Sequence, residues 1–173
     1  MSEEIKKGLL GIVVDETTIS HVVPELSALT YRGYTVQELC DKCDFEEVAY
    51  LVLNGELPNK NQLKKFIKQE RSERKLSKQI LNDIKKMPRN AHPMDVIRTC
   101  VSLMALEDKD TKDNSPKANM RKAMRIFAKT PTAVAAYFRT RKGKSIIAPS
   151  KKLSFSENVF KMMFNRVPDK EIV

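Results

Sequence analysis

The chain has 173 residues, of which 41% are hydrophobic, and carries a formal net charge of +10. This length suits one domain with a sizeable core, and no apolar run approaches the roughly 20 residues of a membrane-spanning helix, so we expect no membrane partner. An acidic start without a small-residue cleavage site argues against a secretory signal, and three cysteines leave one unpaired in any disulfide scheme, which favours a cytoplasmic location.

The N-terminal part of the sequence has the pattern of short extended segments. LLGIVVD (residues 9–15) and ALTYRGY (28–34) have the β-branched and aromatic content of strands. Gly11, Pro24 and Gly33 interrupt them. We therefore predict short strands here, before the pattern changes to successive helices after Tyr34.

Two capping boxes predict where the first helices begin. Thr35 is followed three positions later by Glu38, and Asp44 by Glu47. Apolar residues cover most of the circumference of the second helix, so we expect it to be buried. Asn54-Gly55 ends it. Two amphipathic helices then follow, over 59–75 and 77–87.

AHPMDVIRT (91–99) contains one of the two histidines, beside Pro93 and three positions before Asp95. This group could be a catalytic cluster or the start of a buried helix. A residue before proline disfavours helical backbone, and proline suits the first helical position. We therefore interpret His92 as a hydrogen-bonded structural residue at the start of a largely apolar helix.

The pattern in the last third of the sequence predicts two more helices. After the polar loop 107–117, Ser115 and Pro116 begin a helix that we expect to kink or break at Pro131 and to end at Gly143. SENVFKMMFN (156–165) is the last helix. The predicted class is all-α, with short extended segments at the N-terminus.

No motif by itself indicates catalysis. Cys40 and Cys43 form a CxxC pair, but no second pair of ligands follows it, with Cys100, His21 and His92 scattered, so we predict no metal. The five glycines are dispersed and make no phosphate-binding loop, and no catalytic triad can be proposed from spacing.

The positive charge raises nucleic acid as a partner, because Lys64 to Lys78, Lys117 to Lys129 and Arg139 to Lys144 are rich in basic residues. However, Glu70 and Glu73 interrupt the first stretch, and no alternating aromatic residues provide a stacking platform. Most cations are lysines rather than the arginine forks that read base edges. We interpret the charge as a lysine-covered surface and predict no nucleic-acid partner.

Several segments, in order, resemble the citrate synthase family, and more closely its 2-methylcitrate synthase branch: LTYRGYTVQEL, FEEVAYLVLNGELP, AHPMDVIRT, AKTPTAVAA, IAPSKKLSFSENVF and FNRVPDKEIV. The resemblance spans essentially the whole chain. Ala105 and Asn165 depart from it, since the family often has glycine there. The resemblance implies that residues 1–173 are the N-terminal portion of the large helical domain, without the small domain and the C-terminal helices.

The resemblance also implies a homodimeric acyltransferase that condenses acetyl-CoA or propionyl-CoA with oxaloacetate, without a metal or other cofactor. In the family, an aspartate and two histidines carry out the reaction, and they lie after the position of Val173. The chain therefore contains no catalytic residue by this comparison, and we expect it to be inactive alone. His92 falls in the family's structural HPM segment.

Arg74 is the one residue that the resemblance marks as a substrate contact, because it matches an arginine before the family's "LP" turn. That turn reads Leu76-Ser77 here, and the alternative is a surface salt bridge. A different class of function also stays open: a stand-alone helical binding module that uses its basic surface, for example to bind nucleic acid.

Overall fold

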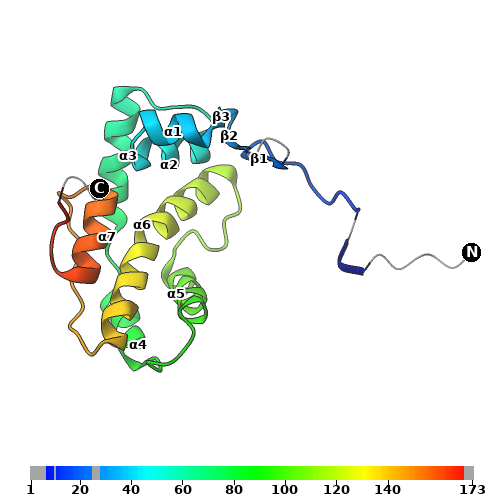
Figure 1. Ribbon diagram of the computed structural model, residues 1–173. Helices are drawn as coiled ribbons and strands as arrows, with labels where there is room; N and C mark the ends of the chain where they lie inside the picture. The colour runs from blue at the N-terminus through cyan, green and yellow to red at the C-terminus, as the bar shows by residue number, and fades with distance from the viewer. Residues whose placement is uncertain (1–6, 10, 25–27, 170–173) are drawn as a thin grey trace, which may run out of the picture. The chain divides into compact units, whose positions relative to one another are not determined.

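The computed structural model describes residues 7–9, 11–24 and 28–169 of the chain. Within them the protein is mainly helical, with seven α-helices and one three-stranded sheet (Figure 1). The chain divides into two compact units, residues 1–57 and 58–173. The predicted class, all-α with short extended segments near the N-terminus, is confirmed.

The first unit contains a small antiparallel sheet formed by β1 (Ser20–Val23), β2 (Ala28–Tyr31) and β3 (Tyr34–Thr35), paired in that order. The turn Arg32-Gly33 joins β2 to β3 with positive φ at both residues, 50° and 88°, as a tight hairpin turn requires. The guanidinium of Arg32 donates to the Thr18 hydroxyl at 2.6 Å and to the Val52 carbonyl at 3.1 Å. The strands predicted in ALTYRGY are therefore confirmed.

The strand predicted over LLGIVVD is wrong. Lys7–Leu9 form a short 3₁₀ helix, residues 11–15 form no strand, and Leu10 lies outside the described residues. Val13 and Val14 are 83% and 72% exposed. β-branched residues form strands when they pack against a partner strand, and the sheet of the described residues gives this segment none.

Both predicted capping boxes mark helix starts in the first unit. α1 (Val36–Lys42) begins after Thr35, whose hydroxyl accepts from the Glu38 amide at 3.2 Å. α2 (Phe45–Asn54) begins after Asp44, whose amide donates to the Glu47 carboxylate at 2.8 Å, and the left-handed Gly55 ends it. The expectation that α2 is buried is wrong for the described residues: Leu51 is fully buried, but Phe45 is 46% exposed, because neighbours cover only part of the helix.

The second unit consists of five helices: α3 (Lys60–Glu73), α4 (Lys78–Lys86), α5 (Pro93–Glu107), α6 (Pro116–Arg141) and α7 (Phe155–Phe164). The longest, α6, contacts each of the other four (Figure 1). Side chains of Asn59, Ser77, His92, Ser115 and Ser154 cap the helix starts. None of the helices in the described part of the chain is long and apolar enough to cross a membrane.

The core of this unit lies where α4, α5 and α6 meet. Its buried members share apolar character and near-zero exposure: Leu76, Ile80, Ile84, Val96, Cys100, Met104, Ala133, Ala136 and Tyr137. The Tyr137 hydroxyl lies 2.7 Å from the Pro88 carbonyl oxygen and 3.0 Å from that of Ala91. The core thereby also fixes the loop that leads to His92.

Of the kink or break expected at Pro131, the break does not occur, because α6 runs continuously from Pro116 to Arg141. Proline removes one helical hydrogen bond and crowds the preceding turn. The residues after it, among them Thr132, Ala133 and Tyr137, are at most 2% exposed. Burial of this half of α6 stabilises the continuous helix against the local cost of the proline.

Candidate functional site

Arg74, the predicted substrate contact, follows the last residue of α3 and is 2% exposed. Its Nε and Nη2 donate to Oε1 and Oε2 of Glu70, both at 2.7 Å. Glu70 lies one helical turn earlier and is 0% exposed, so the two residues form a bidentate ion pair in the interior. The alternative expectation for Arg74 was a surface salt bridge. The salt bridge is present, but it is buried, so the expected surface location is wrong.

The other contacts of Arg74 hold segments that are distant in sequence. Its Nη1 donates to the carbonyls of Ser150 at 2.7 Å and Leu153 at 3.0 Å. The Thr132 hydroxyl in α6 donates to the Arg74 carbonyl at 2.7 Å. Arg74 therefore joins α3, α6 and the segment before α7, while its contact with a substrate stays a prediction.

A cavity of about 430 Å³ lies beside Arg74. Its ionisable lining residues are all cationic: Arg71, Arg74, Lys75, Lys85 and Lys151. Most of the remaining wall is apolar: Leu76, Leu81, Ile146, Ile147, Ala148 and Pro149. Small-molecule sites commonly measure roughly 300–1,000 Å³. The arrangement can therefore hold a small ligand that is partly anionic and partly apolar; we call it the basic cavity.

His92 has the structural place that its sequence context predicted. It is exposed, its backbone is extended, and its Nδ1 accepts a hydrogen bond from the Met94 amide at 3.3 Å. Asp95 instead pairs with Arg98 at 3.1 Å, on the solvent side. No hydrogen bond within the described residues joins His92 to this pair, so the interpretation of His92 as a helix cap is confirmed.

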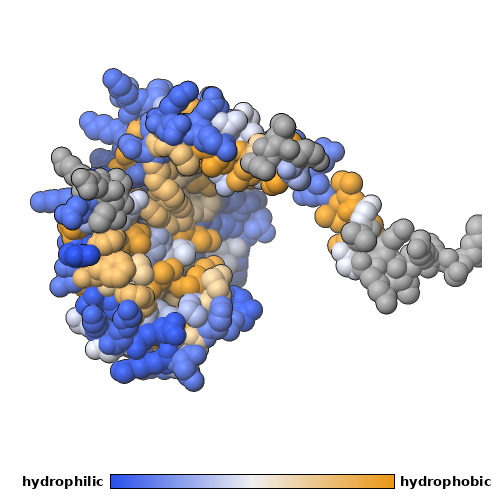
Figure 2. Space-filling model, in the orientation of Figure 1, coloured by the Kyte–Doolittle hydropathy of each residue, from blue (hydrophilic) through white to orange (hydrophobic). Residues whose placement is uncertain are grey.

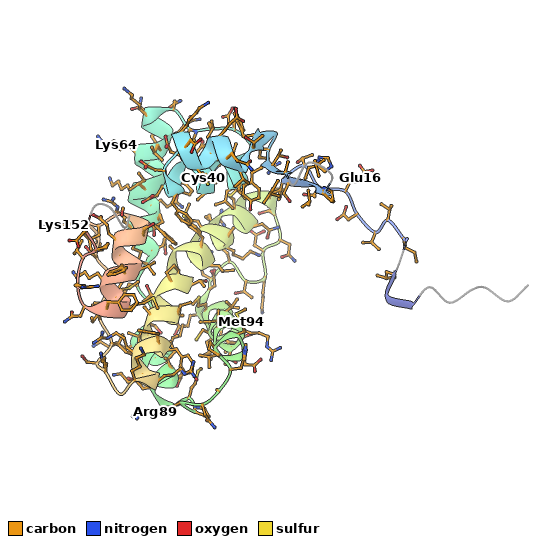
Figure 3. The ribbon with its side chains drawn as sticks, in the orientation of Figure 1. Glu16, Cys40, Lys64, Arg89, Met94 and Lys152 are labelled. Atoms are coloured by element: carbon orange, nitrogen blue, oxygen red, sulfur yellow. The ribbon has the colours of Figure 1, made fainter. Side chains whose placement is uncertain are left out.

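The cysteines and acids of the described residues form no cluster of three or more possible metal ligands. Cys40, labelled on α1 in Figure 3, is exposed, and Cys43 is half-buried. Burial raises the pKa of the Cys43 thiol, and Glu47 and Asp44 raise it further. Burial alone raises the pKa of Cys100 to about 11. Both thiols are therefore protonated at neutral pH and are weak nucleophiles.

Arginines of the basic stretches make contacts within the chain. Arg125 bridges Asp108 at 2.7 Å and Asp110 at 2.6 Å, and Arg121 binds Asp110 at 2.8 Å. Arg139 is buried, donating to the carbonyls of Ser145 and Met163. Arg121 and Arg125 thus hold the loop between α5 and α6, and Arg139 holds the segment after α6 and the end of α7. These guanidinium groups are therefore engaged within the chain and are not free to contact nucleic-acid bases.

The basic cavity was not predicted from the sequence. The four-residue spacing of Glu70 and Arg74 in ERSER was a signal for the ion pair. The cavity itself had no comparable signal, because Ile146 and Lys151 come from a segment about 70 residues further along the chain.

Known proteins are similar to this chain in sequence and fold. The sequence model of a family described as "Citrate synthase, C-terminal domain" matches residues 8–173. A 2-methylcitrate synthase of Mycobacterium tuberculosis is 46% identical over 98% of this chain, which spans 43% of that protein. A citrate synthase of Mycolicibacterium smegmatis is 45% identical over 98% of this chain and 45% of its own length. The crystal structure of a citrate synthase from Pyrobaculum aerophilum matches with a TM-score of 0.88 and 31% identity, covering 94% of this chain and 43% of that one. The chain thus spans less than half the length of these relatives.

Proposed function

Because this chain belongs to the citrate synthase family, we propose that it forms the N-terminal portion of the large helical domain of a longer enzyme. The proposed enzyme is a cytoplasmic acyltransferase that condenses propionyl-CoA or acetyl-CoA with oxaloacetate. The observation that carries this proposal is the identity to a 2-methylcitrate synthase along nearly the whole chain. The three free cysteines support a reducing compartment.

In this proposal, the chain supplies scaffold rather than chemistry. Its two histidines, His21 and His92, are exposed, and His92 caps α5. The aspartate and histidines that the family uses would come from residues outside this chain. The buried pair of Glu70 and Arg74 would keep α3, α6 and the start of α7 in place, and preorganisation of this kind is what an active site built on such helices needs.

A homodimer is part of the proposal, and apolar surface on two helices supports it. Met94 and Leu106 on α5 are 65% and 84% exposed, and Met120, Ile126 and Val134 on α6 are 41%, 42% and 37% exposed. Figure 2 shows hydrophobic surface over the middle of the view, where Figure 1 places α6. Apolar patches on soluble proteins often mark sites of association.

The preferred acyl group is a finer proposal. The identities to a 2-methylcitrate synthase and to a citrate synthase, 46% and 45%, favour neither substrate. We propose propionyl-CoA because the segment IAPSKKLSFSENVF resembles the 2-methylcitrate synthase branch. A strong preference of the longer enzyme for acetyl-CoA would move the assignment to citrate synthase.

A chimera tests the scaffold role. The matched segment of the M. tuberculosis 2-methylcitrate synthase is replaced by this chain, and thiol release from propionyl-CoA is measured with and without oxaloacetate. We expect the chimera to be active and the 173-residue chain alone to give no release above a buffer blank. The same chimera with Ile84→Asp, which puts a charge at a fully buried position, should lose activity, and the matched surface change Lys86→Gln should keep it.

Two outcomes would contradict the proposal. One is a soluble, dimeric chimera without activity, and the other is oxaloacetate-dependent thiol release by the isolated chain. Binding of labelled RNA or DNA by the isolated chain at physiological salt, combined with an inactive chimera, would favour the stand-alone binding module instead.

A further inference from the structure

The basic cavity contains positive charge in excess of the ion pair between Arg74 and Glu70. Glu70 neutralises Arg74, which leaves Arg71, Lys75, Lys85 and Lys151 around the opening. We propose that this cavity binds a small organic phosphate, a phosphate ester with a compact apolar or aromatic body.

The four cations come from separate parts of the second unit. Arg71 lies on α3, Lys75 follows it, Lys85 is on α4, and Lys151 precedes α7. Within the described residues, none of the four is in an ion pair. The pKa of Glu157 is lowered mainly by hydrogen bonds from Ser154 and also by the positive charge of Arg71. Like charges gathered at one opening raise the local concentration of anions.

Arg71 adds a hydrogen-bonding requirement to the charge. Its Nε is buried and has no hydrogen-bond partner among the described residues, and Arg71 lines the cavity. A buried donor without an acceptor is costly, and most such donors in proteins are paired. A phosphate in the cavity would lie beside the planar fork of Arg71, which suits phosphate.

The apolar wall defines the other half of the ligand. Leu81, Ile146 and Ile147 are only partly exposed and face the same cavity. A volume of about 430 Å³ is far larger than one phosphate group fills, so an apolar or aromatic body attached to the phosphate gains buried contact area there. An ester is therefore favoured over inorganic phosphate.

Calorimetric titration of the 173-residue chain tests this binding without acyl-CoA or oxaloacetate, so its result is independent of the proposed condensation. The probe is adenosine 5′-monophosphate, compared with adenosine and with inorganic phosphate. We expect the monophosphate to bind about tenfold or more tightly than either comparator, because each of them keeps only half of the proposed contacts. Its affinity should fall as salt is raised.

Matched variants separate a built site from general positive charge. Lys85 and Lys86 are adjacent exposed lysines in the last turn of α4, but only Lys85 lines the cavity. We expect Lys85→Gln to weaken binding about tenfold and Lys86→Gln to change it less than about twofold, although both remove one charge. Arg71→Gln should weaken binding at least as much as Lys85→Gln, with Lys68→Gln, an exposed position of α3 outside the cavity, as its control.

Three results would overturn the proposal: monophosphate that binds no better than adenosine, inorganic phosphate that binds as tightly as the ester, or equal losses in Lys85→Gln and Lys86→Gln. Thermal melts of each variant without ligand show whether it is folded, and the exposed Lys85→Gln keeps the test valid even if Arg71→Gln does not fold.

Discussion

Replacing Arg74 by methionine should destabilise the protein strongly through the charge that it leaves behind. Arg74 and Glu70 are 2% and 0% exposed, and the substitution removes both hydrogen bonds to the Glu70 carboxylate. It also removes the donors to the Ser150 and Leu153 carbonyls. Breaking one partner of a buried ion pair costs about 3–5 kcal/mol. That is a large share of the roughly 5–15 kcal/mol by which a domain is stable.

Urea unfolding followed by far-ultraviolet circular dichroism measures this loss, with protein concentration held constant because association would shift the midpoint. The double variant Glu70→Gln/Arg74→Met should be less destabilised than Arg74→Met alone, since it leaves no unpaired buried charge. Arg98→Met is the control: its partner is Asp95, the side chains are 80% and 63% exposed, and an exposed pair contributes about 0–1 kcal/mol.

The reasoning would be refuted if Arg74→Met lowered the free energy of unfolding no more than Arg98→Met does. It would also fail if the double variant were less stable than the single one, because the uncompensated Glu70 carboxylate would then not be the source of the loss.

His92→Ala should lower stability by about 1 kcal/mol through loss of the α5 cap while leaving turnover of the proposed longer enzyme unchanged; lost turnover at an unchanged melting temperature would contradict the structural role. Alkylation followed by mass spectrometry should modify the exposed Cys40 first and the fully buried Cys100 only on unfolding, and early labelling of Cys100 would be inconsistent with its burial. Hydrogen bonds from Arg121 and Arg125 hold the pKa of Asp110 well below its ordinary value, so Asp110→Asn should reduce stability at neutral pH. The difference from the unaltered chain should begin to shrink as pH falls below about 4, where the unfolded carboxyl protonates, and should disappear only as pH falls through the lowered pKa of the folded state; a difference that grows in acid has the wrong sign. The isolated chain should self-associate and bind a hydrophobic dye through its exposed apolar residues, and a monomer that binds no dye in sedimentation and fluorescence measurements would argue against this.

The residue sequence predicted local structure well where a side chain acts on its own backbone. Thr35 with Glu38 begins α1, Gly55 ends α2, and the proline after His92 fixes the start of α5. These signals are reliable because a cap or a left-handed turn involves residues within about four positions of each other. The family resemblance also rested on short segments of sequence, and the match of the citrate synthase family model to residues 8–173 confirms it.

Only the tertiary structure decided which residues are buried and which meet. LLGIVVD has the composition of a strand but forms none in its described part, and Pro131 has the chemistry of a helix break but lies inside α6. The pairing of Glu70 with Arg74 was readable from a spacing of four, whereas its burial came from α6 and from the segment before α7. The basic cavity likewise joins Arg71 to Lys151. Burial and proximity depend on neighbours far along the chain, and a local pattern carries no information about those neighbours.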